Sequence, residues 1–177
     1  WLLQVSAYTL LSLPEETAPK AEDSSMDKLR VRFRTMTLRA QIAADGTFPH
    51  ELTTDAPYRN SLFNLDMLAA ICQLLSTRFE SAWHYQLEDG PGMRGAIAYH
   101  FPYIANPGSW PYRADNSHFE ELPGRRASLL LCARAYLRPE YAELWRRLKP
   151  DEASPTVERT VPIHQPLLWV RQPPRVS

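Results

Sequence analysis

One segment of this sequence, residues 61–76, is apolar on almost every side of a helix. Its apolar side chains are those of Leu62, Phe63, Leu65, Met67, Leu68, Ile71, Leu74 and Leu75. A helix that is apolar around its whole circumference is buried on most sides. The rest of the chain must therefore place other elements around this segment.

The other segments with regular apolar spacing also have the period of a helix. They predict helices over about residues 1–13, from a cap at Ser24 or Ser25 to near Ala44, and over about 91–105, 125–137 and 139–148. Pro102 is expected to kink the 91–105 helix or to end it early. No βαβ alternation and no alternating strand pattern is found, so the sequence predicts an all-α fold of antiparallel helical hairpins. The spacing alone leaves a solenoid, a bundle and a closed ring open.

Composition excludes several classes of function. The chain has 177 residues, a common length for one domain, with 20 basic and 20 acidic residues, so its net charge indicates neither a nucleic acid nor a membrane surface as partner. No apolar run reaches the length of about 18 residues that would predict a membrane-spanning helix. Cys72 and Cys132 lie in apolar helical runs and are predicted to be reduced core thiols. The absence of CxxC, HxxxH and HExxH patterns argues against a metal site, and no cofactor is expected.

Polar and aromatic residues gather in three long loops, over residues 45–60, 103–126 and from 151 onward. Ordered loops on a helical scaffold are common binding sites. Simpler roles are also open. Asn60 or Ser61 is expected to cap the 61–76 helix, Asn64 and Asp66 to satisfy nearby backbone donors, and Trp110 and Tyr112 to hold a loop against the core.

Several motifs, in order, resemble the C-terminal half of the alginate lyase family. They are DGTFPHEL (45–52), PYRNSLFNLD (57–66), AAICQLLS (69–76), GPGMRGAI (90–97), YIANPGSWPY (103–112) and PIHQPLLW (162–169). The family consists of polysaccharide lyases that act on polyuronates such as alginate and glucuronan. The resemblance implies a partial α/α toroid, an upstream half with an Asn-His pair that is absent here, and a periplasmic or secreted protein. Residues 1–177 are therefore expected to be the C-terminal portion of one such domain.

The resemblance also implies a reaction, β-elimination. A base removes the proton from C5 of a uronate ring, a C4–C5 double bond forms and the C4–O bond breaks. The substrate carboxylate must be neutralised and a proton donor must lie nearby. Tyr58 is expected to be the acid/base, with Asn60 and Arg59 neutralising the carboxylate. His50 and Asn64 are expected to bind substrate at the positive end of the helix, and Trp110 and Tyr112 to stack on sugar rings.

Two positions depart from the family pattern. An arginine after the EL pair and a tyrosine before SLFN are replaced by Thr54 and Asn60, and the nearest substitutes are Arg59 and Tyr58. A non-catalytic saccharide-binding protein on the same scaffold is therefore an alternative. A helical domain for protein interaction is a more distant one. In the saccharide hypotheses, the segment 58–64 and Trp110 or Tyr112 should lie together in one groove.

Overall fold

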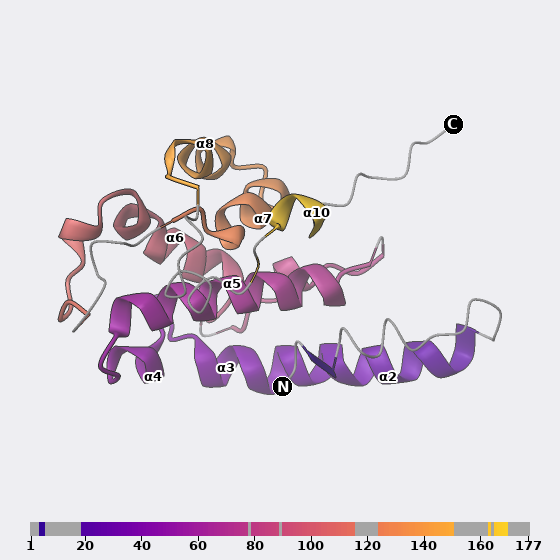
Figure 1. The fold of residues 1–177 in the computed structure, drawn as a ribbon. Helices are drawn as coiled ribbons and strands as arrows, with labels where there is room; N and C mark the ends of the chain where they lie inside the picture. Colours follow the sequence, from indigo (N-terminus) through magenta and orange to yellow (C-terminus); the bar gives the residue numbers. More distant parts are fainter. Residues whose placement is uncertain are drawn as a thin grey trace.

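Two long antiparallel helices run side by side through the structure, a computed structural model (Figure 1). The first joins α2 (Pro19–Arg32), a π-helical segment η1 (Phe33–Thr37) and α3 (Leu38–Gln41) without a break. After the short helix α4 (Pro49–Leu52), α5 (Pro57–Leu75) returns beside it. The structure describes residues 4–5, 19–77, 79–88, 90–115, 124–150, 163 and 165–169. The helix predicted over residues 1–13 falls almost wholly outside them.

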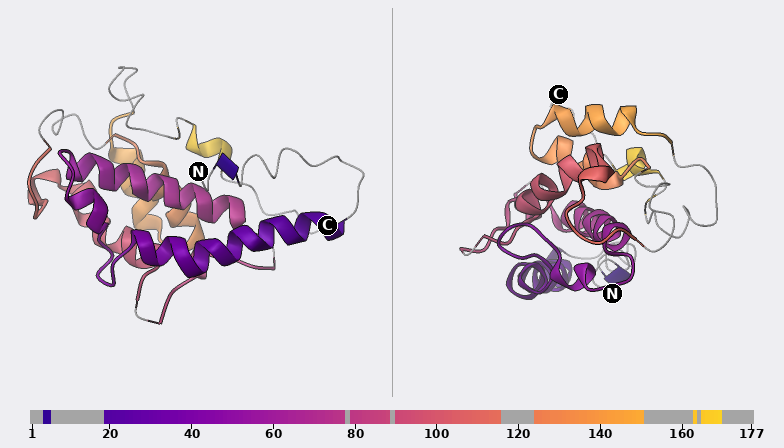
Figure 2. Two further views of the ribbon diagram at one scale, coloured as in Figure 1. Left: turned by 90° about the horizontal axis from the view of Figure 1, so that it is seen from below. Right: turned by 90° about the vertical axis from the view of Figure 1, so that its left-hand side faces the viewer.

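The remaining helices pack on the other side of α5 (Figure 2). They are α6 (Met93–Ala105), α7 (Ala127–Ala135), α8 (Pro139–Arg147) and α10 (Pro166–Trp169), with 3-10 turns η2 (Ala82–His84) and η3 (Pro107–Ser109). Helix α7 contacts α5, α6, α8 and α10. In the described residues the only β-pairing is one isolated antiparallel bridge between Gln86 and Gly92. The prediction of an all-α fold built from helical hairpins is confirmed.

Helix α5 is the centre of the core, as its apolar sequence predicts. Leu62, Leu65 and Leu75 are fully buried, and burying one such side chain contributes about 1.5–3 kcal/mol. The helix is not buried on every side, because Phe63 is 37% exposed. Cys72 and Cys132 are both free and buried, which confirms the predicted core thiols.

The start of α2 differs from the prediction, and Pro102 does not end α6 early. Helix α2 begins at Pro19 rather than at a cap formed by Ser24 or Ser25. Helix α6 continues through Pro102 to Ala105. Pro102 lies in the last turn of α6, where its missing N–H removes one helical hydrogen bond near the end. The helix therefore continues past the proline.

Asp66 and Arg126 form an ion pair within the core. Arg126 Nη2 lies 2.7 Å from Asp66 Oδ2, and both side chains are fully buried. The other oxygen, Asp66 Oδ1, accepts the backbone N–H of Ser128 at 2.9 Å. Ser128 is in the first turn of α7, so a carboxylate from the middle of α5 satisfies a donor at the start of α7.

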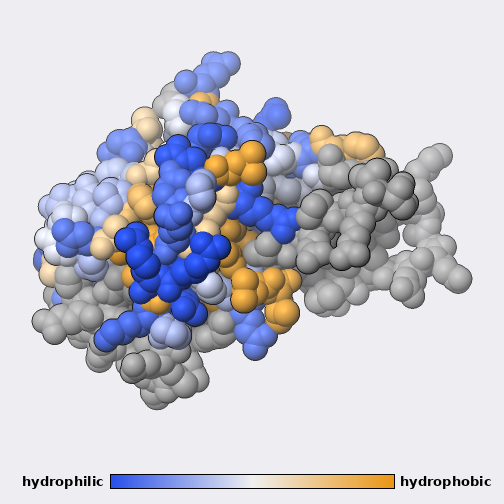
Figure 3. Space-filling model, turned by 90° about the horizontal axis from the view of Figure 1, so that it is seen from above, coloured by the Kyte–Doolittle hydropathy of each residue, from blue (hydrophilic) through white to orange (hydrophobic). Residues whose placement is uncertain are grey.

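The face that carries α8 is mainly hydrophilic, with its hydrophobic residues in separate patches (Figure 3). Large exposed hydrophobic residues include Leu137, Leu167 and Leu168. Among the described residues, no helix combines the length and apolar character needed to cross a bilayer.

Candidate functional site

The start of α5 lies where the sequence places the candidate site. The helix begins at Pro57, not at Asn60 or Ser61, and the N-cap residue Ala56 makes no side-chain cap. Proline is well suited to the first helical position because its missing N–H has no helical partner there. Asn60 and Ser61 are therefore inside the helix, and the prediction that either of them caps it is wrong.

A distant carboxylate caps this helix instead. Asp115 accepts the backbone N–H of Tyr58 on Oδ1 at 2.8 Å and that of Arg59 on Oδ2 at 2.9 Å. Asp115 is 8% exposed. The positive end of α5 thus already holds an anion. A substrate carboxylate would have to bind the side chains beside the helix end, not the end itself.

Removing this cap should destabilise the protein. We expect Asp115→Ala to lower the free energy of unfolding by about 2 kcal/mol, the upper range for loss of a cap, because one buried and one partly buried N–H donor lose their acceptor. Asp115→Asn keeps one acceptor oxygen and should cost about half as much. Urea denaturation measures both. Asp55→Ala, at a carboxylate whose side chain is 91% exposed, is the control and should change stability by less than about 0.5 kcal/mol. Parent-like stability of Asp115→Ala would contradict the capping role.

Two side-chain amides lie one turn apart on α5. Asn60 Nδ2 donates to the hydroxyl oxygen of Thr54 at 3.0 Å, and Asn64 Nδ2 donates to Gln41 Oε1 at 3.0 Å. Both asparagines are half-buried. Thr54 and Asn60, the two departures from the family pattern, are therefore hydrogen-bonded to each other.

Tyr58 is fully buried. Its hydroxyl donates to the backbone carbonyl of Tyr103 at 3.0 Å, and burial raises the pKa of Tyr58 above its ordinary value. Its ring meets Trp110 edge to face, with centroids 5.2 Å apart. The predicted proximity of the 58–64 segment to Trp110 is confirmed. The position of the Tyr58 hydroxyl favours packing over proton transfer.

Trp110 holds its loop against the core. It is 8% exposed and contacts the rings of Tyr58, His100, Tyr103 and Tyr112, with centroids 5.2–6.2 Å apart. This environment favours the simpler of the two predicted roles, a loop anchor, over a sugar platform. Tyr112 differs because it is 40% exposed, and its hydroxyl accepts a hydrogen bond from Tyr99 at 3.3 Å.

The remaining predicted residues lie nearby at the surface. His50 is exposed on α4, and Arg59 is half-buried in the first turn of α5. Sequence reasoning missed Arg113, which donates from Nη2 to the Thr54 carbonyl at 3.0 Å and lies 3.3 Å from Asp55 Oδ1. It also missed Asp115. No local pattern marks either residue, because both act on a segment more than 50 positions away.

His100 is a buried histidine within the aromatic cluster. Its ring stacks on Phe48 with centroids 4.7 Å apart, and Nδ1 lies 2.8 Å from the Ala96 carbonyl, so Nδ1 carries the proton. Burial lowers the pKa of His100 from 6.5 to about 4.

This histidine should make the fold sensitive to acid. The unfolded chain takes up the His100 proton near pH 6.5, whereas the folded chain resists it down to about pH 4. The free energy of unfolding should therefore fall by up to about 3 kcal/mol as the pH is lowered from 6.5 to about 4, since one pKa unit corresponds to about 1.4 kcal/mol. Urea denaturation at a series of pH values measures the slope. His100→Phe keeps an aromatic ring and should flatten the curve in this window. An equally steep curve for His100→Phe would assign the effect to other groups.

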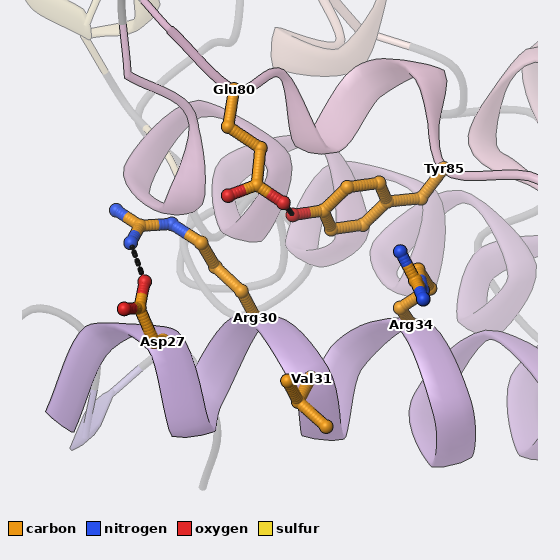
Figure 4. A pocket seen from close by; sticks show the side chains of 6 residues that line it. All are labelled: Asp27, Arg30, Val31, Arg34, Glu80 and Tyr85. Carbon is orange, nitrogen blue, oxygen red and sulfur yellow. Dashed lines mark hydrogen bonds and ion pairs between the residues drawn. The ribbon is translucent and has the colours of Figure 1, made fainter. Parts of the chain in front are cut away.

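A pocket lies near the C-terminal end of α5, the end of the helix opposite Asn60. It has a volume of about 250 Å³ and is lined by Asp27, Arg30, Val31, Arg34, Glu80 and Tyr85 (Figure 4). Arg30 pairs with Asp27 at 2.6 Å and donates to the last carbonyl of α5, that of Leu75. The Tyr85 hydroxyl donates to Glu80. Two arginines and two carboxylates balance one another there, so we assign this pocket no role in binding an anion.

The described residues contain no group of three or more His, Cys, Asp or Glu side chains arranged to hold a metal ion. The arrangement at the start of α5 offers amide, guanidinium and phenol donors. Such donors suit an anionic, hydroxyl-rich ligand.

Comparisons with known proteins identify the fold and the family. A structure described as that of an alginate lyase from Bacteroides ovatus is similar, with a TM-score of 0.69 and 24% sequence identity. The match covers 89% of this chain and 39% of that one, so the chain spans well under half the length of this similar protein. The likeness confirms the predicted α/α toroid fold. A search of curated proteins found no match. The family model for alginate lyase matches residues 21–110, which is just over half of the sequence, and the chain therefore belongs to the alginate lyase family.

Proposed function

We propose that this chain is part of a polysaccharide lyase that cleaves an anionic polyuronate, of the alginate or glucuronan type, by β-elimination. The observation that carries the proposal is the family match over residues 21–110. That range contains every predicted site residue except Tyr112. Polyuronates are polymers found outside the cytoplasm, so we further propose a periplasmic or secreted location.

Carboxylate neutralisation is assigned to Asn60 and Arg59. A proton next to a carboxylate is a weak acid, because its removal places a second negative charge on the same group. Hydrogen-bond donors that are fixed in advance lower this cost. The amide nitrogen of Asn60 carries two N–H donors, and its hydrogen bond to Thr54 uses one of them. The other is available for a substrate oxygen, as is the guanidinium of Arg59, which is half-buried at the same turn.

Proton transfer is assigned to Tyr112 in preference to Tyr58. The Tyr58 hydroxyl is buried and donates to a backbone carbonyl. Tyr112 is 40% exposed, and its oxygen accepts the Tyr99 hydroxyl. Tyr112 is thus the better placed of the two to take the C5 proton and return it to the leaving oxygen.

A non-catalytic saccharide-binding role is the second candidate. Its support is the Thr54–Asn60 pair, which stands where the family resemblance implies an arginine and a tyrosine. Such a protein would bind the polymer with the same donors and would lack the chemical step.

Product formation separates the two candidates. The full-length product of the gene is expressed and incubated with glucuronan, alginate and a neutral β-1,4-glucan. The lyase proposal predicts rising ultraviolet absorbance from unsaturated uronates with at least one acidic polymer and none with the neutral one. Binding of an acidic polymer without any such product would favour the second candidate. Neither binding nor product with either polyuronate would overturn both.

A further inference from the structure

The loop that follows Trp110 is fixed at two points. The Trp110 ring is buried among four other aromatic rings at one end of the segment 110–115. At the other end, Asp115 makes two backbone hydrogen bonds to the first turn of α5. Between these two anchors, Tyr112 is 40% exposed and the side chain of Arg113 is 60% exposed. The fold thus fixes the backbone of a loop whose middle residues face solvent.

We propose that Arg113 is a substrate-binding residue that recognises the carboxylate of a uronate sugar. This inference rests on the proposed function and adds a residue that neither the sequence motifs nor the family resemblance identified. A guanidinium binds a carboxylate through two parallel N–H donors, which gives both charge and geometry.

Thr54 places Arg113 next to Asn60. The Thr54 carbonyl accepts Arg113 Nη2 at 3.0 Å, and the Thr54 hydroxyl oxygen accepts Asn60 Nδ2 at 3.0 Å. Two donors that meet on one residue are close enough to bind the same sugar unit. Arg113 therefore belongs to the same site as the amide assigned to carboxylate neutralisation.

The interactions that Arg113 makes in the free protein are weak enough to exchange. Its ion pair with Asp55, at 3.3 Å, joins side chains that are 60% and 91% exposed. Exposed pairs of this kind contribute little to stability because water screens them. Nη2 makes the contacts with Thr54 and Asp55, and a guanidinium has five N–H donors. A substrate carboxylate can replace Asp55 as the partner.

The proposal predicts that substitutions of Arg113 and of Asp55 change the Kd for acidic oligosaccharides in opposite directions. Arg113→Gln should raise both Kd and KM for acidic oligosaccharides by about 10-fold, the scale of a lost hydrogen bond to a charged group. Arg113→Lys keeps the charge without the planar fork and should have an intermediate effect. Asp55→Asn removes the internal competitor and should lower Kd by about 2-fold to 3-fold.

Calorimetry with glucuronan and alginate oligosaccharides gives Kd, and product formation gives KM. Cellotetraose is a neutral β-1,4-linked counterpart of glucuronan oligosaccharides. Its Kd should be the same for the parent and for every variant. Arg138→Gln is the matched control, because Arg138 is also an exposed arginine paired with a carboxylate, that of Glu140. Thermal unfolding of each variant shows whether the fold is intact.

Two outcomes would overturn the proposal in different ways. A folded Arg113→Gln protein that keeps the parent's Kd and KM would remove Arg113 from the site and leave the lyase function standing. A parent protein that binds no uronate oligosaccharide would overturn both the role of Arg113 and the proposed function.

Discussion

Replacing Arg126 with methionine is expected to lower the free energy of unfolding by about 3–5 kcal/mol. Arg126 and Asp66 are fully buried and lie 2.7 Å apart. Removing the cation leaves a carboxylate in the core without its counter-charge, and that cost exceeds the gain from a more apolar side chain. For a chain of this length, such a loss lowers the melting temperature by about 10 °C. Urea denaturation and thermal unfolding measure the two quantities.

The double variant Asp66→Leu/Arg126→Met tests the cause. With both charges removed, much of the lost stability should return. Recovery should be incomplete, because the N–H of Ser128 loses its acceptor on Asp66. Arg138→Gln, at an exposed ion pair, should cost less than about 1 kcal/mol. If Arg126→Met lowers the free energy of unfolding by as little as Arg138→Gln does, the buried pair does not contribute to stability as its burial implies.

Tyr112→Phe should reduce the rate of polyuronate cleavage by about 100-fold or more, the usual scale for a positioned proton donor. The change removes only a hydroxyl, and that hydroxyl is at the surface, so stability should hardly change. Tyr58→Phe is the matched comparison. It removes a hydroxyl that donates to the Tyr103 carbonyl and should cost about 1 kcal/mol of stability while leaving most of the activity.

Initial rates with saturating polymer, together with urea denaturation, measure both effects in both variants. The reverse pattern, with Tyr58→Phe inactive and Tyr112→Phe active, would restore Tyr58 to the chemical step. Equal rates for all three proteins would exclude both tyrosines from proton transfer.

Much of the helical framework could be predicted because its signal is local. The apolar residues of 61–76 identify the core helix, now α5 (Pro57–Leu75). Pro139 marks a break between two helices, which the structure places between α7 and α8. Periodicity within one segment is sufficient for predictions of this kind.

The start of α5 could not be predicted, because its cap comes from far away in sequence. Asp115 is 57 positions from Tyr58. A rule that looks for a capping side chain just before the helix therefore selects Asn60 or Ser61 instead. Asp66 raised the same difficulty, since it satisfies a donor of α7 that is 62 positions away.

Sequence placed the aromatic residues together correctly but did not reveal which of them face solvent. Tyr58 and Trp110 are 5.2 Å apart, as expected for one region. Residues 57–60 belong to α5 rather than to the loop before it, and each residue along a helix turns the side chain by about 100°. The helix therefore sets which of these four side chains point inward. Trp110 is surrounded by rings from several segments, and its neighbour Tyr112 is exposed. Only the packed structure distinguishes the two.

The central claim is β-elimination on a polyuronate, and the chemical nature of the newly formed chain ends tests it most directly. The full-length product of the gene is incubated with glucuronan and alginate. The oligosaccharide products are then analysed by mass spectrometry and NMR. The account predicts a ring with a C4–C5 double bond at each new non-reducing end, with a mass lower by one water than that of a hydrolysis product. Saturated chain ends, or both polymers left intact, would contradict it.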